Sequence, residues 1–471
     1  MGKISIKRIL ITVGIIVIIL FMIGITYIHF NYEKTDNEKI VDLNQYIDVK
    51  YNETSNVTIV NATKDYIVNK SFSIKNTYNK TLYYSIVLSN VTNNFDKNSL
   101  VFSLISDDGA YIEKSYIIND NYILASLIKI EPSNTHEYKF NLKVTTSDTN
   151  NKTFSSNIKV NVLSLDSLYD FNSLYAYVIG NNPKLYKNEL NIEDGVYYTN
   201  NSINGNTVYF YRGTNELNNN LVLGNYCYKI IRTTEDLGVR IIYNGKFNNG
   251  ICDGENNTLD LTTFNNNSNY NAYVGYIYGS ANSSNYESEH ENVNPSNIMK
   301  KVNEFYQNNL VKYSSYIANS IYCSNRKTDS FVLNSVKYDI LGYKNYNTGY
   351  NSMYRLLNNE VSYNCENNND RLNNERITYP IGLLSADEAF YAGLNRESEN
   401  TLNYLNSSLS YWTITPAYYN GINAYNFIIE DGKISESEVN KEHAIRPVIT
   451  LKNSVKVKSG NGNYDNPYIL E

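Results

Sequence analysis

Apolar and polar residues are arranged in three distinct ways along this chain, and each arrangement predicts a different kind of element. Residues 9–28 form an apolar run that contains no charge. About 20 such residues in a helix match a hydrocarbon layer roughly 30 Å thick, and a helix satisfies its own backbone there. Three basic residues precede the run: Lys3, Lys7 and Arg8. Because positive charge is retained on the cytoplasmic side, we expect a cytoplasmic tail over residues 1–8, a transmembrane helix over residues 9–28, and residues 30–471 outside the cell.

A cleaved signal peptide is the alternative for this segment. Its apolar part usually spans about 7–15 residues and ends at a small-residue cleavage site. The run here is longer, and the residues that follow it, His29 to Glu33, offer no such site. The first cysteine is Cys227, so no lipid-modified cysteine follows the run. We therefore expect an uncleaved, single-pass anchor in the plasma membrane.

Alternation with a period of two dominates residues 45–163. Apolar side chains occupy every second position over residues 82–88, 138–144 and 158–162, with mainly polar residues between them. Side chains that alternate in this way point to opposite faces of a strand. Clusters of turn-forming residues separate the segments, for example at residues 131–134. Several short strands at this spacing predict an all-β sandwich.

Helical spacing appears only after residue 163. Apolar residues between Leu165 and Tyr177 recur at near-helical intervals, which predicts a linker helix within residues 164–185. Farther on, Asn294 followed by Pro295 predicts the start of a helix, since Asn is a good N-cap and Pro suits the first helical position. Ser385 with Glu388 forms a capping-box pattern, which predicts the start of a second helix.

Strand-like stretches surround these two helices. They include residues 207–211, 227–232 and 239–243, and shorter ones around Trp412 and Val448. Strands and helices mixed in this way predict an α+β domain over residues 186–471. The whole chain of 471 residues is long enough for two or three domains.

Charge and cysteine usage narrow the function classes. The formal net charge is -6 and no basic block is present, so nucleic-acid binding, which wants a basic face, is set aside. Four cysteines lie in the C-terminal part: Cys227, Cys252, Cys323 and Cys365. An even number outside the cell favours disulfides. Proximity suggests Cys227–Cys252 and Cys323–Cys365, although four cysteines allow three pairings, and four buried thiols remain the alternative. Zinc is not expected, because there is no C-x-x-C and none of the four histidines is spaced as a ligand. No other metal and no cofactor is expected.

The alternating region resembles a known type of surface domain. The strings FSIKNTYNKTLYYSIVLSNV, LVFSLISDDG and IEPSNTHEYKFNLKV within residues 45–163 are similar to the Ig-like sandwiches of surface and biofilm-matrix proteins of low-GC Gram-positive bacteria, including the camelysin-like group. That resemblance implies either a spacer that lifts the next domain off the membrane or self-assembly through sheet edges. The spacer role is preferred.

A second resemblance spans residues 186–471. It is carried by several strings in order along the chain: Asn225–Thr233, Ala272–Gly279, Tyr379–Glu388, Tyr411–Pro416, Ile445–Ile449, Gly460–Gly462 and Asn466–Tyr468. Together they resemble an uncharacterised C-terminal domain of surface proteins from low-GC Gram-positive bacteria. That domain looks like a C-type-lectin-like fold, in the branch that contains formylglycine-generating enzymes and retroelement-diversified receptors.

Departures from those families limit what the resemblance implies. Sugar-binding C-type lectins use a Glu-Pro-Asn or Gln-Pro-Asp loop and a Trp-Asn-Asp strand, whereas the only Trp here reads Trp412-Thr413-Ile414. Calcium-dependent sugar binding therefore does not follow from the fold alone. Formylglycine-generating enzymes use a copper-binding cysteine pair, and Cys323 and Cys365 are expected to be structural instead.

Three residues are ligand-binding candidates: Tyr411, Trp412 and Arg446. A large aromatic ring can anchor a ligand, although it more often fills a core. Arg446 could bind a carboxylate, but we prefer a buried arginine paired with Asp387 or Glu388. His290 and His443 are read as exposed loop residues.

The sequence thus favours a non-enzymatic surface protein that binds or adheres through its C-terminal domain. No catalytic motif is recognisable. The partner would be an extracellular glycan or protein, contacted by the long loops of residues 255–295 and 325–375. An extracellular enzyme that acts on wall or glycan is one alternative, which a cleft with raised-pKa carboxylates or a histidine–nucleophile pair would support. A structural biofilm-matrix protein is the other.

Overall fold

The computed structural model describes residues 43–471 apart from residues 97–98, 118–121, 164–169, 171 and 191–192. The chain divides into two units, residues 1–45 and residues 46–471. The second unit contains two regions: the sandwich, residues 47–163, and the C-terminal region, residues 174–471.

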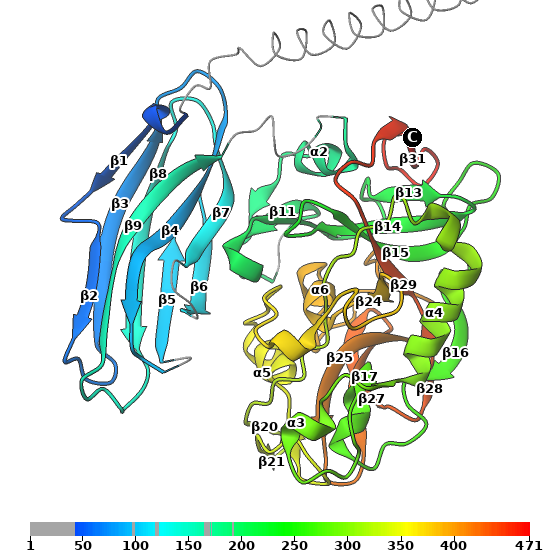
Figure 1. Cartoon of the computed structure of the whole chain (residues 1–471). Coiled ribbons are helices and arrows are strands. Elements are labelled where there is room, and N and C mark those ends of the chain that lie inside the picture. The colour runs from blue at the N-terminus through cyan, green and yellow to red at the C-terminus, as the bar shows by residue number, and fades with distance from the viewer. Residues whose placement is uncertain (1–42, 97–98, 118–121, 164–169, 171, 191–192) are drawn as a thin grey trace, which may run out of the picture. The chain divides into compact units, whose positions relative to one another are not determined.

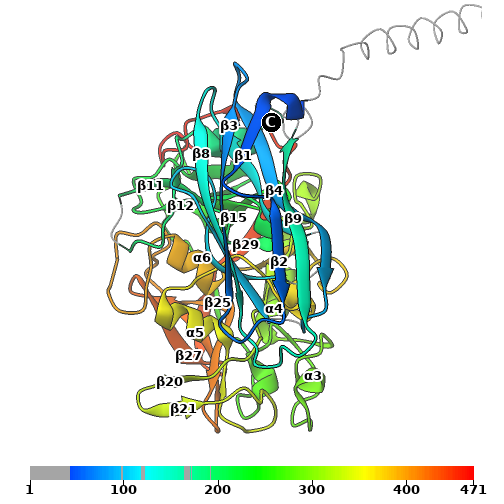
Figure 2. The same ribbon diagram turned by 90° about the vertical axis from the view of Figure 1, so that its left-hand side faces the viewer.

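The sandwich consists of two antiparallel sheets, which are blue to cyan in Figure 1. The first sheet has the order β1 (Ile47–Tyr51), β3 (Ile67–Asn76), β8 (Thr135–Val144), β5 (Leu100–Ile105) and β6 (Tyr111–Tyr116). The second has the order β2 (Asn56–Val60), β9 (Thr153–Leu163), β4 (Leu82–Asn93) and β7 (Ile123–Ile130). Figure 2 shows β1, β3 and β8 side by side at the edge of the first sheet.

Period-2 alternation places the sandwich core. In β8, every second side chain from His136 to Val144 is buried, and β5 alternates in the same way. The strands expected over residues 82–88, 138–144 and 158–162 are confirmed as parts of β4, β8 and β9. The outermost strand β6 differs, because Ile112 is its only buried residue.

One polar cluster lies inside this core. The Tyr84 hydroxyl is 2.7 Å from the His136 Nδ1 atom and 2.7 Å from the Tyr138 hydroxyl. The Tyr138 hydroxyl also accepts a hydrogen bond of 3.0 Å from the Ala110 amide. Burial lowers the pKa of His136, so this imidazole ring is neutral at pH 7 and can form hydrogen bonds with the hydroxyls.

A ten-stranded mixed sheet forms the first part of the C-terminal region. Its main path is β10 (Lys184–Leu185), β11 (Gly195–Thr199), β12 (Val208–Arg212), β14 (Tyr226–Thr233), β13 (Asn220–Leu223), β31 (Tyr468–Leu470) and β30 (Val457–Ser459). Three further strands extend it from β14: β15 (Val239–Lys246), β29 (Pro447–Leu451) and β24 (Ile381–Leu383). Strands β12 and β13 are buried at every position, which indicates that both faces of this sheet are covered.

A six-stranded sheet forms the second part. It contains β16 (Leu259–Thr263), β28 (Glu442–Ile445), β25 (Tyr411–Tyr419), β26 (Ala424–Glu430), β27 (Lys433–Glu438) and β22 (Thr348–Gly349). Three two-stranded ribbons complete the strands: β17 (Ile277–Tyr278) with β18 (Asn294–Pro295), β19 (Tyr322–Cys323) with β23 (Arg371–Leu372), and β20 (Phe331–Leu333) with β21 (Val336–Tyr338). The chain passes from β28 to β29 through Arg446, so this residue stands where the two large sheets meet.

The helices of the described chain are short. The α-helices are α2 (Leu174–Ile179), α3 (Tyr286–Glu289), α4 (Asn297–Asn309), α5 (Asn351–Asn358) and α6 (Ala386–Tyr391). The 3-10 turns are η1 (Leu43–Tyr46), η3 (Ile203–Gly205), η4 (Asn271–Val274), η5 (Val311–Tyr313) and η6 (Asn368–Asp370). The expected linker helix is represented by the six residues of α2, which Ser173 caps.

The two predicted helix starts have different outcomes. The capping box is confirmed, because the Ser385 side chain accepts from the Glu388 amide and the Glu388 side chain accepts from the Ser385 amide. The start at Asn294 is wrong, since Asn294 and Pro295 form strand β18. Ser296 caps α4 instead, by accepting a hydrogen bond from the Met299 amide.

The expected fold class, a transmembrane helix followed by an all-β sandwich and an α+β domain, is wrong. Among the described residues, 43% are in strands and 13% in helices, so the fold is mostly β-sheet. Apolar segments of four to eight residues carry too little periodicity to separate a short helix from a strand. Within the described ranges no helix is long and apolar enough to cross a membrane. The segment expected to do so, residues 9–28, lies outside those ranges.

Candidate functional site

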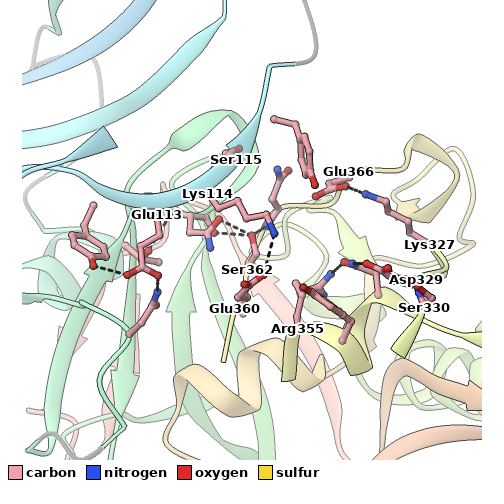
Figure 3. Close-up of a pocket in the computed structure, with 18 residues that line it drawn as sticks. Glu113, Lys114, Ser115, Lys327, Asp329, Ser330, Arg355, Glu360, Ser362 and Glu366 are labelled. Carbon is pink, nitrogen blue, oxygen red and sulfur yellow. Dashed lines mark hydrogen bonds and ion pairs between the residues drawn. The ribbon is translucent and has the colours of Figure 1, made fainter. Parts of the chain in front are cut away.

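A cleft of about 540 Å³ is the main candidate site, and its lining is entirely polar or tyrosine. Strand β6 of the sandwich supplies one side, and segments of the C-terminal region supply the rest (Figure 3). The lining residues are Tyr111, Glu113, Lys114, Ser115, Tyr116, Asn188, Thr199, Asn201, Lys327, Asp329, Ser330, Asn351, Tyr354, Arg355, Glu360, Ser362, Asn364 and Glu366. Ligand pockets usually have predominantly apolar walls, so this composition selects ligands that form many hydrogen bonds.

Glu113 defines one end of the cleft. Its Oε1 accepts from the Tyr111 hydroxyl at 2.6 Å, and its Oε2 accepts from the Asn188 side-chain amide at 2.6 Å. Burial, with a further contribution from Glu113, raises the pKa of Tyr111 to about 12. The phenol therefore stays protonated and donates to the carboxylate over the physiological range.

An ion pair and a hydrogen-bonded loop occupy the middle of the cleft. Lys114 Nζ lies 3.4 Å from Glu360 Oε2, and both side chains remain partly exposed. The Ser362 hydroxyl donates to Asn201 Oδ1 at 2.8 Å, and Asn201 Nδ2 donates to the Val361 carbonyl at 2.9 Å. These bonds fix the loop that carries Glu360, which holds this part of the wall in place.

Helix α5 positions the floor. Arg355 donates to both carboxylate oxygens of Asp387, from Nε at 3.0 Å and from Nη2 at 2.7 Å. Burial alone would lower the pKa of Arg355, but the nearby negative charge of Asp387 outweighs it and raises that pKa. At the N-terminal end of the helix, Asn351 Nδ2 donates to Asp329 Oδ2 at 2.8 Å.

Lys327 and Glu366 form an ion pair at the remaining side, with the Lys327 ammonium 5.5 Å from the centre of the Tyr116 ring. Tyr116 belongs to the sandwich and Lys327 to the C-terminal region. This contact is one of several that join the two sides of the cleft.

Buried hydrogen bonds elsewhere hold the sandwich against the C-terminal region. Thr207 donates to the Ser126 carbonyl from its amide at 2.9 Å and from its hydroxyl at 2.7 Å. Asn200 Nδ2 in turn donates to the Thr207 hydroxyl at 2.8 Å. Next to them Gly205 has φ +62, and a Cβ atom there would lie 2.2 Å from the Leu124 carbonyl oxygen. Only glycine allows so close an approach, and the fit indicates a preformed cleft.

The three ligand-binding candidates from the sequence lie elsewhere. Tyr411, Trp412 and Arg446 are all 0% exposed in the core of the C-terminal region, and none lines the cleft. Trp412 donates from its indole N–H to the Thr262 carbonyl at 2.9 Å and packs edge-on against Phe264. The structure therefore places Trp412 as a core side chain with its polar atom satisfied.

Arg446 does not have the expected carboxylate partner. Its guanidinium donates to two carbonyls, of Tyr243 and Leu405, and to Asn244 Oδ1 and the Tyr411 hydroxyl. Each candidate carboxylate is engaged by other arginines. Neutral oxygens at the junction between β28 and β29 thus satisfy this buried cation.

Glu388 is the centre of a buried ionic group. Its Oε1 lies 2.8 Å from Arg232 Nε and 2.8 Å from Arg240 Nη1. Burial alone would raise the pKa of Glu388, but the two guanidinium groups lower it to about 2. The tyrosine rings of Tyr363 and Tyr322 lie beside Arg232 and Arg240 respectively. These residues are inaccessible and support the fold.

Both disulfides lie in the C-terminal region. Cys227 is bonded to Cys252 and Cys323 is bonded to Cys365, which is the pairing that proximity in the sequence suggests. In the described part of the chain, no three His, Cys, Asp or Glu side chains converge as the ligands of a metal ion would.

Neither histidine singled out in the sequence is an exposed loop residue. His290 is 2% exposed, and its Nε2 lies 2.8 Å from the Gly342 carbonyl oxygen. His443 is half-buried in β28, with Nδ1 2.6 Å from the Ser410 hydroxyl and Nε2 2.7 Å from the Ser437 hydroxyl. A neutral imidazole bonded at both nitrogens accepts from one hydroxyl and donates to the other. This histidine–serine group lies outside the cleft.

The lining of the cleft overlaps one of the two loops from which ligand contacts were expected. The expected contact loop over residues 325–375 carries Lys327, Asp329, Arg355 and Glu366 among others, whereas no lining residue comes from residues 255–295. The contribution of β6 was missed. The available signal was the string Tyr111-Ile112-Glu113-Lys114-Ser115-Tyr116, which contains one aliphatic residue. Because such a strand has few apolar side chains to bury, its polar side chains can contact a neighbouring region or a ligand.

Comparison of the chain with protein-family models, with curated proteins and with solved structures finds no match.

Proposed function

We propose that this protein is an extracellular binding protein and that its cleft holds a polyhydroxylated ligand, a glycan. The observation that carries the proposal is the lining: three tyrosines and fifteen polar side chains, with no aliphatic residue among them. Amides, carboxylates and hydroxyls of this kind match the alternating donors and acceptors of a sugar. A preformed cleft also limits the ordering free energy that binding must overcome.

Two disulfides support an extracellular or secreted location, because such bonds persist in oxidising compartments. The proposal assigns the sandwich a different role from that of a spacer. Five of the lining residues belong to β6: Tyr111, Glu113, Lys114, Ser115 and Tyr116. The sandwich is therefore proposed as one wall of the binding site.

We propose binding without turnover. In the cleft, the described contacts give each carboxylate a partner that fixes it: Glu113 with Tyr111, Asp329 with Asn351, Glu360 with Lys114 and Glu366 with Lys327. The competing enzymatic function would use the Ser410–His443 pair, in which a histidine nitrogen lies within hydrogen-bond reach of a possible nucleophile. That pair lies outside the cleft, so the two functions make different predictions for one experiment.

The experiment is binding of the full-length protein to an array of neutral and charged oligosaccharides, followed by chromatography of the bound sugars. We expect retention of an intact ligand. The Asn364 side chain lines the cleft and has no hydrogen-bond partner in the described chain, so Asn364→Ala should weaken binding by about tenfold, the equivalent of one or two hydrogen bonds. Asn218→Ala, at an exposed position away from the cleft, is the matched control.

Two results would contradict the proposal. Unchanged binding by Asn364→Ala would place the ligand outside the cleft. Conversion of the sugar by the native protein, lost in Ser410→Ala, would establish the enzymatic function instead.

A further inference from the structure

The charges of the cleft do not balance. All three cations are engaged by carboxylates: Lys114 by Glu360, Lys327 by Glu366 and Arg355 by Asp387. Two carboxylates of the lining have no such partner, Glu113 and Asp329. Figure 3 shows them on opposite sides of the view, with Lys114 and Glu360 between them.

Only neutral donors hold Glu113. The Tyr111 hydroxyl and the Asn188 amide each bond to one of its oxygens, and the side chain stays exposed. An ionised carboxylate oxygen has two acceptor sites. Each oxygen of Glu113 therefore keeps capacity for one more donor, and its charge remains uncompensated.

Asp329 repeats this arrangement at the other side. Its Oδ2 accepts from Asn351 Nδ2, and its Oδ1 accepts from the Ser330 amide, both at 2.8 Å. The Oδ1 of Asn351 in turn accepts from Arg355 Nη1. The Asn351 amide is thus oriented by the floor of the cleft, and it holds the aspartate in place without neutralising it.

We propose that the ligand is a glycan that carries free primary amines, an oligomer of de-N-acetylated amino sugars. Its ammonium groups pair with Glu113 and Asp329, and its hydroxyls bond to the amides between them. This inference rests on the proposed function and specifies its ligand. Because Lys114 and Lys327 are neutralised by their own partners, they do not offset the attraction of these two carboxylates for a cation.

The test uses two ligands that differ only in the amine: N-acetylated chito-oligosaccharides and the same oligomers after de-N-acetylation. Binding to the full-length protein is measured at a mildly acidic pH that keeps the sugar amines protonated. We expect the de-N-acetylated oligomer to bind about tenfold more tightly at low ionic strength. That preference should shrink as salt screens the exposed charges.

Charge-removing variants locate the effect. Glu113→Gln and Asp329→Asn keep the shape of each side chain and should each reduce the preference for the amine from about tenfold to about threefold, while binding of the N-acetylated oligomer changes little. Glu397→Gln, at an exposed position outside the cleft, should leave the preference unchanged.

The outcomes separate this inference from the function on which it rests. Equal affinity for the two oligomers, or a preference that is undiminished in both variants, overturns the amine assignment and leaves glycan binding in place. Binding of basic peptides such as oligolysine without either sugar overturns both and makes the cleft a protein-binding site. No binding of any oligosaccharide overturns the proposed function itself.

Discussion

The sandwich and the C-terminal region bury their residues by different means. The sandwich core is built from alternating strands such as β8, and its main buried polar group is the neutral cluster of Tyr84, His136 and Tyr138. It contains no cysteine. The C-terminal region holds two disulfides and buries whole ion pairs, among them Glu388 with Arg232 and Arg240, and Asp370 with Arg326.

This contrast reflects what each region has to hold. Two facing sheets need only an apolar stripe on each strand, because the sheets satisfy their own backbone groups. The C-terminal region joins two large sheets through many loops and short helices. Loops leave polar groups that need specific partners, and buried guanidinium groups with several donors each can supply them. The sandwich should therefore depend on apolar packing, and the C-terminal region on charges and crosslinks.

The largest expected effect comes from removing the charge at the centre of the C-terminal region. In Glu388→Gln the guanidinium groups of Arg232 and Arg240 lose their shared carboxylate while they remain buried. Loss of one partner of such a group destabilises a protein by about 3–5 kcal/mol. Trp412, the only tryptophan, lies in this region, so its fluorescence in a denaturant titration reports the loss directly.

The matching change in the sandwich is Glu137→Gln, at an exposed position of β8. It should alter the free energy of unfolding by less than about 0.5 kcal/mol. If Glu388→Gln were no more harmful than this control, the ionic group would not be a main support of the C-terminal region.

Crosslinks give the next effect. Replacing Cys323 and Cys365 together by serine frees a loop with a sequence separation of 42 residues, which should destabilise the Trp412-monitored transition by about 2–4 kcal/mol. The pair Cys227 and Cys252, separated by 25 residues, should contribute about 0.5 kcal/mol less because loop-closure entropy grows slowly with length.

Hydrogen exchange checks that this effect is regional. The β3 and β8 amides of the sandwich should keep their protection in the double serine variants. Equal loss of protection in both regions would mean that the sandwich depends on the disulfides of the C-terminal region. That result would contradict the contrast between the two regions.

The same contrast explains which features could be read from the sequence. Period-2 alternation located β4, β8 and β9, since burial on one face requires it. The capping box at Ser385 was equally visible, because both of its partners lie within four residues. Asn294 failed as a helix start because its backbone pairs with Tyr278 in a ribbon, a tertiary contact that no local pattern contains.

The pairing of buried charges in the C-terminal region could not be predicted from the sequence. Arg446 was expected to pair with Asp387 or Glu388, but these carboxylates bind Arg355, Arg232 and Arg240 instead. From the sequence alone, any arginine could pair with any carboxylate, because only the fold fixes the distances between them. The cleft is hidden for the same reason, since Glu113 and Asp329 lie more than 200 positions apart in the chain and become neighbours of one cavity only when the sandwich and the C-terminal region fold together.

The smallest expected effect is a pH dependence that follows from buried histidine. Burial lowers the pKa of His290 to about 3, with a smaller contribution from Arg326. The unfolded chain has a histidine pKa of about 6.5 and takes up the proton first, so the stability is complete above that pH and is lost as the pH falls. Between pH 7 and pH 5 the loss from His290 amounts to about 2 kcal/mol.

His290→Gln isolates this effect, because a glutamine amide can still donate to the Gly342 carbonyl but does not titrate. The Trp412-monitored free energy of unfolding should fall less between pH 7 and pH 5 in the variant than in the native protein, by about 2 kcal/mol. Burial raises the pKa of the adjacent Glu289. That shift changes the stability with pH in the opposite sense, but equally in both proteins.

The sandwich has its own buried histidine, His136, whose pKa is also lowered by burial. Protection of the β8 amides should thus decline with acid to the same extent in both proteins. A variant that flattened the pH dependence of both regions would show that the two do not unfold independently, and the division between an apolar sandwich and an ionic C-terminal region would then describe their cores but not their stability.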